Sequence, residues 1–248
     1  MSLKTGIIIQ ARTNSSRFPN KILTPFYNNL SVLEFLIKRI ESITDDTVVI
    51  ATTNKKEDEP IIEIAKKLDI KYFKGSEENV LKRFIDCAKK FKFSRIIRVC
   101  SDNPFLDLED LMILSNQNSP HDYICFSRDR QPTITSHLGF WAEKVSLNAL
   151  IKIQESTNKI TYLEHVTNYI YTHPNKFEIK KIEIPDEFKR DNIRLTLDTK
   201  EDFIILKDII SNIDKTGFDF TKYDILNHIK KNPTYFEKMT DNIKKNEK

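Results

Sequence analysis

Short apolar runs and helical patterns alternate along the first half of the chain. The runs GIIIQA (6–11), TVVIAT (47–52), KYF (71–73) and RIIRVC (95–100) have the length of strands, and the longer ones lack the polar alternation of a half-exposed strand. Because helical patterns with short connections separate these runs, they predict a parallel, twisted sheet that is covered by helices on both faces.

Three helices are predicted between these strands. Ser31 and Glu34 have the spacing of a capping box, and apolar residues at helical spacing follow them. Pro60 suits the first turn of a second helix. A third helix is expected over residues 80–88, where the apolar positions again have helical spacing.

The second half of the chain has a looser pattern. Strands are expected at DYICFS (122–127), EIKKIEI (178–184) and IRLTLDT (193–199), and helices from about Ser146, over TYLEHVTNYIYTHP (161–174), from Thr199 and over KYDILNHIKKN (222–232). The chain has no repeat and no low-complexity linker. One domain over residues 1–248 is therefore predicted, with 121–190 as an insertion or subdomain and 233–248 as a flexible tail.

Composition and charge narrow the class of protein. Hydrophobic residues make up 39% of the 248 residues, which is enough for a sizeable core. The 40 basic and 36 acidic residues are spread along the chain, which argues against a general nucleic-acid binder. No apolar run approaches the roughly 18 residues of a membrane span. The three cysteines are far apart and form no CxxC pair, so a reducing cytoplasm is expected rather than a disulfide or zinc framework.

The first strand leads into a short basic loop, QARTNSSRFPNK (10–21). Arg12, Arg17 and Lys21 lie within ten residues there. Ligands of open parallel sheets bind beyond the carboxyl ends of the strands, and backbone N–H groups together with these cations suit a polyphosphate. The loop matches neither the Walker pattern nor GxGxxG, and an exposed basic turn is the alternative.

Two carboxylates also follow apolar strands. Asp102 comes directly after RIIRVC, and Asp198 closes IRLTLDT. Two such groups can share one Mg²⁺ ion and bring it against phosphate, although Asp102 also suits a helix cap or an Asx-turn. After TVVIAT, Thr52, Thr53 and Asn54 suit either a base edge and ribose or an ordinary turn.

Other candidates favour structural roles. His165 lies on a predicted helix beside aromatic residues, where a single histidine is more often structural than a ligand. Phe140 and Trp141 suit the core better than a pocket wall.

Several separated motifs, in one consistent order, resemble the cytidylyltransferases related to spore-coat polysaccharide biosynthesis protein F. More distantly, the chain is similar to the synthetases of CMP-activated acidic sugars. The motifs run from residue 6 to about residue 210: IIIQARTNSSRFPNKIL, VVIATTNKKEDEPI, YFKGSEENVLKRF, RVCSDNPFLD, EHVTNYIY and IRLTLDTKEDF.

The resemblance implies a three-layer, Rossmann-like nucleotide-diphospho-sugar transferase (GT-A-like) fold. It also implies transfer of CMP from CTP to an acidic sugar or related acceptor, with release of pyrophosphate, in surface polysaccharide or glycan biosynthesis. The implied catalytic residues are Arg12, Arg17, Lys21 and Asp102; the nucleotide-binding residues are Ala11, Ser15, Ser16, Ala51, Thr52, Thr53, Gly75 and Ser76; and the Mg²⁺ ligands are Asp102 and Asp198.

The chain departs from its relatives at a few positions. Asn14 and Asn20 replace glycines, and asparagine tolerates left-handed backbone angles better than other non-glycine residues. Trp141 replaces an aspartate, while Glu143 keeps a second acid, so a changed acceptor is expected. Residues 127–165 are expected to form the acceptor pocket, and the 121–190 segment to pair two chains into a homodimer, as in relatives.

Two alternatives stay open. A GT-A glycosyltransferase that uses a finished nucleotide sugar typically carries a DxD-like pair, of which SDN (101–103) supplies one acid. A non-catalytic nucleotide-binding protein of a polysaccharide pathway is the other, because the loop glycines are absent.

Overall fold

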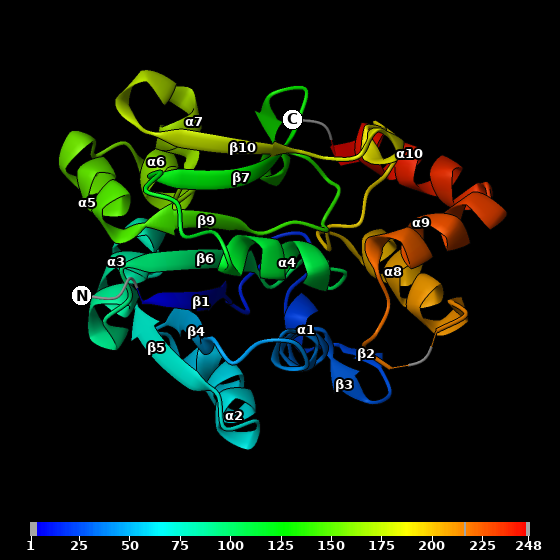
Figure 1. Cartoon of the computed structure of the whole chain (residues 1–248). Helices are drawn as coiled ribbons and strands as arrows, with labels where there is room; N and C mark the ends of the chain where they lie inside the picture. Colours follow the sequence, from blue (N-terminus) through cyan, green and yellow to red (C-terminus); the bar gives the residue numbers. More distant parts are fainter. Residues whose placement is uncertain (1–3, 216, 247–248) are drawn as a thin grey trace.

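The fold is built on one mostly parallel sheet, as predicted. The computed structural model describes residues 4–215 and 217–246. Its eight-stranded sheet has the order β10-β7-β9-β6-β1-β4-β5, with β8 paired to β7. β1, β4, β5 and β6 are parallel neighbours, β10 is parallel to β7, and β9 runs antiparallel between β6 and β7 (Figure 1). The strands are β1 (Thr5–Gln10), β4 (Thr47–Thr53), β5 (Lys71–Gly75), β6 (Arg95–Cys100), β7 (Tyr123–Arg128), β8 (Gln131–Pro132), β9 (Glu143–Ser146) and β10 (Ile179–Glu183).

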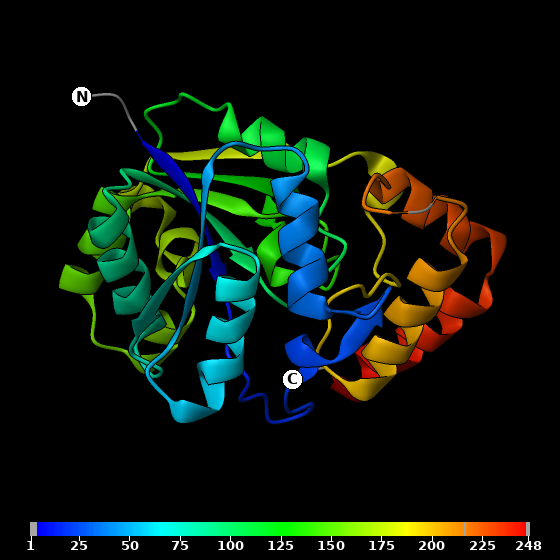
Figure 2. The same ribbon diagram turned by 90° about the horizontal axis from the view of Figure 1, so that it is seen from below.

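Helices cover the two faces of the sheet, because successive strand residues point to opposite sides. In β1, Ile7 and Ile9 join one apolar core, and Ile8 joins the other. Figure 2 shows α1 and α3 on opposite sides of β1. The first face is covered by α1 (Val32–Glu41), α2 (Glu59–Lys67) and α4 (Leu108–Ser115), and the second by α3 (Val80–Phe91), α5 (Leu147–Ser156), α6 (Ile160–Glu164) and α7 (Asn168–Thr172). The three-layer architecture is therefore confirmed.

Residues 121–190 extend this sheet rather than standing apart from it. β9 pairs with β6, so that Arg98 lies opposite Glu143. The single helix expected over 161–174 is wrong: α6 ends at Glu164, and α7 begins at Asn168. The chain turns inward between them, because Val166 is fully buried and the Thr167 hydroxyl donates to Glu143.

The strand expected over 193–199 is also wrong. The segment pairs with no strand of the described sheet, and its backbone N–H groups donate to the carbonyls of two loop residues, His137 and Asp102. Leu195 N donates to the His137 carbonyl at 2.7 Å, and Leu197 N donates to the Asp102 carbonyl at 2.8 Å. Gly139 permits this approach: it has a φ of +71°, and a Cβ there would lie 2.6 Å from the Leu195 carbonyl oxygen.

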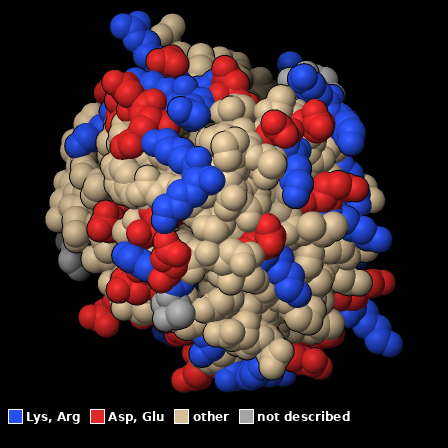
Figure 3. All heavy atoms as spheres, turned by 90° about the vertical axis from the view of Figure 1, so that its right-hand side faces the viewer, with Lys and Arg blue, Asp and Glu red and all other residues tan. Residues whose placement is uncertain are grey.

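Three C-terminal helices lie beyond this segment: α8 (Lys200–Asn212), α9 (Lys222–Lys231) and α10 (Thr234–Asn246) (Figures 1 and 2). The flexible tail expected from residue 233 is therefore wrong for 234–246. Tyr235, Met239 and Asn242 are buried, and residues 247–248 lie outside the described residues. Figure 3 shows acidic and basic side chains interspersed over this side of the molecule.

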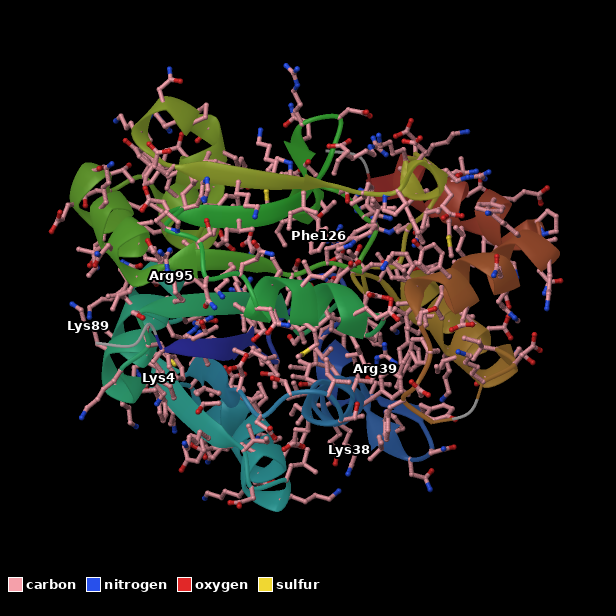
Figure 4. All side chains as sticks on the ribbon, in the orientation of Figure 1. Lys4, Lys38, Arg39, Lys89, Arg95 and Phe126 are labelled. Atoms are coloured by element: carbon pink, nitrogen blue, oxygen red, sulfur yellow. The ribbon has the colours of Figure 1, made fainter. Side chains whose placement is uncertain are left out.

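Arg39 ties the C-terminal part to the sheet layers. Its guanidinium donates to the carbonyls of Leu106 at 3.0 Å and Phe220 at 3.2 Å, and it lies 3.6 Å from the centre of the Phe220 ring. Figure 4 labels it between α1 and the C-terminal helices. Burial lowers the pKa of Arg39 to about 9. In the part of the chain that the structure describes, no helix is long and apolar enough to span a membrane.

Candidate active site

The basic loop leaves the sheet at the edge opposite Lys4 and Arg95, which Figure 4 labels where β1 and β6 begin. It runs from β1 into the short helix η1 (Lys21–Leu23). Asn20 has a φ of 59°, so its predicted left-handed conformation is confirmed. Asn14 is not among the described residues with positive φ, so the substitution there does not preserve a left-handed position.

Asp58 holds this loop against the end of β4. One carboxylate oxygen accepts from the backbone N–H and the hydroxyl of Thr13, each at 2.7 Å. The other accepts from the Thr53 hydroxyl at 2.5 Å and from its N–H at 3.3 Å. Burial opposes the charge of Asp58, but these donors outweigh it and lower the pKa of the carboxyl. Asp58 was not among the predicted site residues, because nothing local distinguishes it from its acidic neighbours.

Replacing Asp58 by alanine is expected to raise the KM for CTP, the nucleotide that the resemblance implies, about tenfold to a hundredfold, because the loop loses its fixed position. Asp58→Asn keeps one acceptor oxygen for Thr13, so its KM is expected to lie between those of Asp58→Ala and wild type. The exposed neighbour Glu57 is the control, since Glu57→Ala touches none of these bonds. Steady-state kinetics with varied CTP measure the effect. An unchanged KM in a folded Asp58→Ala protein would contradict a positioning role.

The two predicted acids converge at the carboxyl ends of the strands. Lys21 Nζ lies 3.0 Å from Asp102 Oδ2 and 3.5 Å from Asp198 Oδ1, and Arg17 lies 3.2 Å from Asp198 Oδ1. Burial disfavours the charge of Asp198, but Lys21, Arg17 and Arg194 together hold its pKa below the ordinary value. The side chains that were predicted to face a polyphosphate and its cation therefore share one site.

Arg194 fixes the position of Asp198 from behind. Its guanidinium is almost fully buried and donates to Asp202 at 2.7 Å, to Asp198 at 3.1 Å and to His137 Nδ1 at 2.8 Å. Because arginine only donates, the Nδ1 atom of His137 is the acceptor. Asp202 also forms a capping box with Thr199 at the start of α8.

Two cavities meet at this cluster. The first, of about 480 Å³, is lined by the basic loop, and the second, of about 550 Å³, lies under residues 133–141. They share six lining residues: Arg17, Arg98, Cys100, Asp102, His165 and Asp198. Burial raises the pKa of the Cys100 thiol to about 11, so this residue stays protonated at neutral pH. The acids and cations thus form the wall between two binding spaces.

A buried network supports the floor of both cavities. Glu143 accepts from Arg98 at 2.7 Å, from Thr167 at 2.8 Å and from the Tyr123 hydroxyl. Glu143, the second acid kept from the family pattern, is only 1% exposed, pairs with Arg98 and lines neither cavity. Arg98 was not among the predicted site residues, although an arginine within the apolar run RIIRVC could have indicated it.

The predicted residues fall into two groups. Those that line the first cavity are Arg12, Ser15, Ser16, Arg17, Lys21, Asp102 and Asp198. Ala11, Ala51, Thr52 and Thr53 are buried, and Thr53 uses its side chain on Asp58. Gly75 and Ser76 lie at the end of β5 and line neither cavity. The assignment of this second group to the nucleoside therefore stays a prediction.

Residues that were expected to be structural also reach the site. His165 is exposed at the end of α6 and lines both cavities. Trp141 is 3% exposed, and its Nε1 donates to Asp110 at 2.6 Å, as a core residue would, although it also lines the second cavity. Asn246 of α10 lines the same cavity.

A basic loop facing two carboxylates at the strand ends of a three-layer α/β fold defines a nucleotidyltransferase. The chain belongs to the cytidylyltransferase family, since the model of that family matches residues 6–245. The protein is accordingly a CTP-dependent nucleotidyltransferase.

Relatives of known sequence and structure agree with this membership. The chain is 34% identical over 229 residues to an uncharacterized protein of Methanocaldococcus jannaschii, with 91% of this chain and 90% of that one covered. It is 34% identical over 234 residues to the spore coat polysaccharide biosynthesis protein SpsF of Bacillus subtilis, with 91% and 94% covered. A solved cytidylyltransferase of Leptospira borgpetersenii superposes with a TM-score of 0.84 at 31% identity and covers 94% of this chain and 97% of its own.

More distant structures share the fold alone. A CMP-2-keto-3-deoxy-manno-octonic acid synthetase complexed with CTP superposes with a TM-score of 0.61 at 12% identity, covering 84% of this chain and 98% of that one.

Proposed function

We propose that this protein transfers CMP from CTP to an acidic sugar or related acceptor and releases pyrophosphate, in the synthesis of a surface polysaccharide or glycan. The observation that carries the proposal is the convergence of Arg17, Lys21, Asp102 and Asp198 on the wall shared by two cavities. One cavity has the cations for a triphosphate, and the other is open to an acceptor. The relative in Bacillus subtilis, named for spore coat polysaccharide biosynthesis, supports the pathway.

In this proposal the first cavity takes the triphosphate. Arg12, Arg17, Lys21 and the hydroxyls of Ser15 and Ser16 hold the phosphate oxygens by charge-assisted hydrogen bonds. The ends of β4 and β5 take the nucleoside, with Ala51, Thr52 and Thr53 near cytosine and with Ala11, Gly75 and Ser76 beside them. Asp58 keeps the loop in place for this purpose.

Asp102 and Asp198 suit a divalent cation, for which we propose Mg²⁺. Carboxylate oxygens are the donors that this ion prefers, and sites that act on phosphates typically use one or two carboxylates together with phosphate oxygens. In residues 4–215 and 217–246 no group of three or more acidic, histidine or cysteine side chains could hold a metal. The bound ion supplies charge stabilisation to the phosphates and to the leaving group. A distant structural relative, 13% identical with a TM-score of 0.56, was solved in complex with manganese.

The chemistry requires positioning more than a dedicated base. An oxygen of the acceptor attacks the α-phosphorus of CTP in line, the bond to the bridging oxygen breaks, and pyrophosphate leaves with both electrons of that bond. Where the attacking oxygen is a hydroxyl, its proton passes to water. Arg17 and Lys21 stabilise the charge that grows on the pyrophosphate. The wall between the cavities brings the two reactants together, which is worth several orders of magnitude in rate.

The second cavity suits the acceptor in this proposal. Hydroxyl, imidazole and amide groups line it, among them Thr135, Ser136, His137, Tyr171 and Asn246. Residues 121–190 supply much of this lining, and we assign to the same segment the pairing of two chains in a homodimer. A cytoplasmic location fits the three free thiols, Cys87, Cys100 and Cys125.

The direct test is pyrophosphate release from CTP and Mg²⁺ with a panel of sugar acids, polyol acids and phosphonates. We expect release with CTP and at least one acidic acceptor, and at least tenfold less with UTP, ATP or GTP. Neutral sugars of the same size are the matched control, because they test whether the acidic group of the acceptor is required. Nucleotide binding without any release across the panel, or release that is equal with a neutral sugar, would contradict the proposal.

A further inference from the structure

Lys21 lies deeper than the other two cations of the basic loop. Its side chain is 11% exposed, whereas those of Arg12 and Arg17 are 38% and 42% exposed. Its ammonium donates to Asp102 Oδ2 at 3.0 Å and to the Leu197 carbonyl at 2.5 Å, and Asp198 Oδ1 lies 3.5 Å away. The ammonium group therefore donates two hydrogen bonds within the protein and forms a longer ion pair with Asp198.

This arrangement conflicts with direct entry of a divalent cation. An ion held by Asp102 and Asp198 would compete with Lys21 for Asp102 Oδ2, and with both Lys21 and Arg17 for Asp198 Oδ1, while Arg194 already contacts Asp198 Oδ2. It would also lie a few ångströms from a buried positive charge, and such repulsion is poorly screened away from water. The same ammonium neutralises two carboxylates that would otherwise repel each other. In the absence of nucleotide, a metal ion must therefore displace the Lys21 ammonium from the two carboxylates that are its anionic partners.

A triphosphate changes this balance, because Lys21 also lines the first cavity. Phosphate oxygens in that cavity offer the ammonium a new partner of higher charge. The lysine side chain has a flexible stem, while its backbone is held in η1, where the Lys21 carbonyl accepts from Thr24 N at 3.3 Å. The head group can thus move toward phosphate without moving the loop.

We propose that Lys21 is an internal counter-cation that keeps a divalent cation off Asp102 and Asp198 until the triphosphate draws the ammonium away. The nucleotide half of this inference rests on the proposed function. Its consequence is cooperative binding: nucleotide raises the affinity for the metal, and the metal raises the affinity for nucleotide by the same factor. Lys21 then has a role before the reaction as well as during it.

The first experiment uses Mn²⁺ alone, with no nucleotide. Binding is measured by electron paramagnetic resonance on the full-length wild type and on Lys21→Met, which keeps the length of the side chain and removes its charge. We expect the variant to bind Mn²⁺ at least about tenfold more tightly than wild type. If Lys21→Met does not fold, Lys21→Gln replaces it, because its amide still donates to the Leu197 carbonyl.

Two controls separate this effect from a general loss of positive charge. Lys55, whose side chain is 52% exposed, forms an ion pair with the partly buried Glu77, and Lys55→Met makes the same change of charge beside an acid outside the Asp102–Asp198 site. We expect no gain of Mn²⁺ affinity there. Adding Asp198→Asn to Lys21→Met should remove the gain, because one of the two carboxylates is lost.

The second experiment measures the coupling between metal and nucleotide. Mn²⁺ titrations with and without α,β-methylene CTP should give a wild-type coupling factor between about fivefold and 150-fold, and a clearly smaller factor in Lys21→Met. Equal Mn²⁺ affinity of wild type and variant without nucleotide would overturn the inference, and so would an unchanged coupling factor. If the analogue does not bind the wild type, the proposed function fails, while the Mn²⁺ comparison still decides the role of Lys21.

Discussion

Asp102→Ala is expected to lower kcat/KM for CTP by about a thousandfold while leaving the protein folded. The carboxylate touches the reacting phosphates through the cation that we propose, and losing such charge stabilisation typically costs two to three orders of magnitude, roughly. The fold should persist, because the backbone carbonyl of Asp102 still accepts from Leu197 N at 2.8 Å, and Lys21 keeps the Leu197 carbonyl and Asp198 as partners.

Shape and charge can be separated at this position. Asp102→Asn keeps the size of the side chain and removes its charge, so we expect nearly the full loss of activity. Asp186→Ala is the matched control, since that carboxylate is 95% exposed and forms an ion pair with Lys189. Pyrophosphate release is measured with the acceptor that the panel identifies. Turnover of Asp102→Ala within twofold of wild type would remove Asp102 from the catalytic site.

Much of the sheet could be predicted because burial on both faces leaves a continuous apolar signal. The runs at 6–11, 47–52 and 95–100 coincide with β1, β4 and β6 to within one residue at each end. A capping box is equally local, and the one predicted for Ser31 and Glu34 forms at the start of α1. These features depend on residues that are neighbours in the sequence.

The errors arose where distant parts of the chain meet. The pattern over 161–174 suits a continuous helix, but Thr167 turns inward to reach Glu143 in another strand. The segment 193–199 is apolar because Ile193, Leu195 and Leu197 are buried in the core, not because the segment belongs to the sheet. The C-terminal helix is held by Asn242, which donates to Thr199 at 3.1 Å, and its polar composition hides that contact.

In the candidate site, too, the residues placed by local sequence were predicted, and those placed by distant contacts were not. The basic loop and the two acids each follow a strand or an apolar segment, so the topology of a parallel sheet was enough to bring them together. Asp58 and the Arg98–Glu143 pair could not be placed, because each acts on partners 45 residues away in sequence. Local spacing carries no information about such a pairing.

The largest loss of stability is expected for Glu143→Ala. Glu143 is 1% exposed and accepts from Arg98, Thr167 and Tyr123, so its removal leaves a buried guanidinium without its ion-pair partner and two hydroxyls without their acceptor. Breaking a buried pair in this way typically costs about 3–5 kcal/mol of unfolding free energy. Glu143→Gln keeps an acceptor oxygen for some of these donors and should cost about 1–3 kcal/mol.

Glu183 provides the control for this loss. It also accepts three contacts, from Ser127 and Asp129 N at 2.8 Å and from Lys189 at 3.2 Å, but its side chain is 46% exposed. Water can replace those partners, so Glu183→Ala should cost no more than about 1 kcal/mol. Urea unfolding followed by circular dichroism gives the unfolding free energies of wild type, Glu143→Ala, Glu143→Gln and Glu183→Ala. If Glu143→Ala and Glu183→Ala lost the same amount, the buried network would not be what holds β9 and α7 together at the floor of the site.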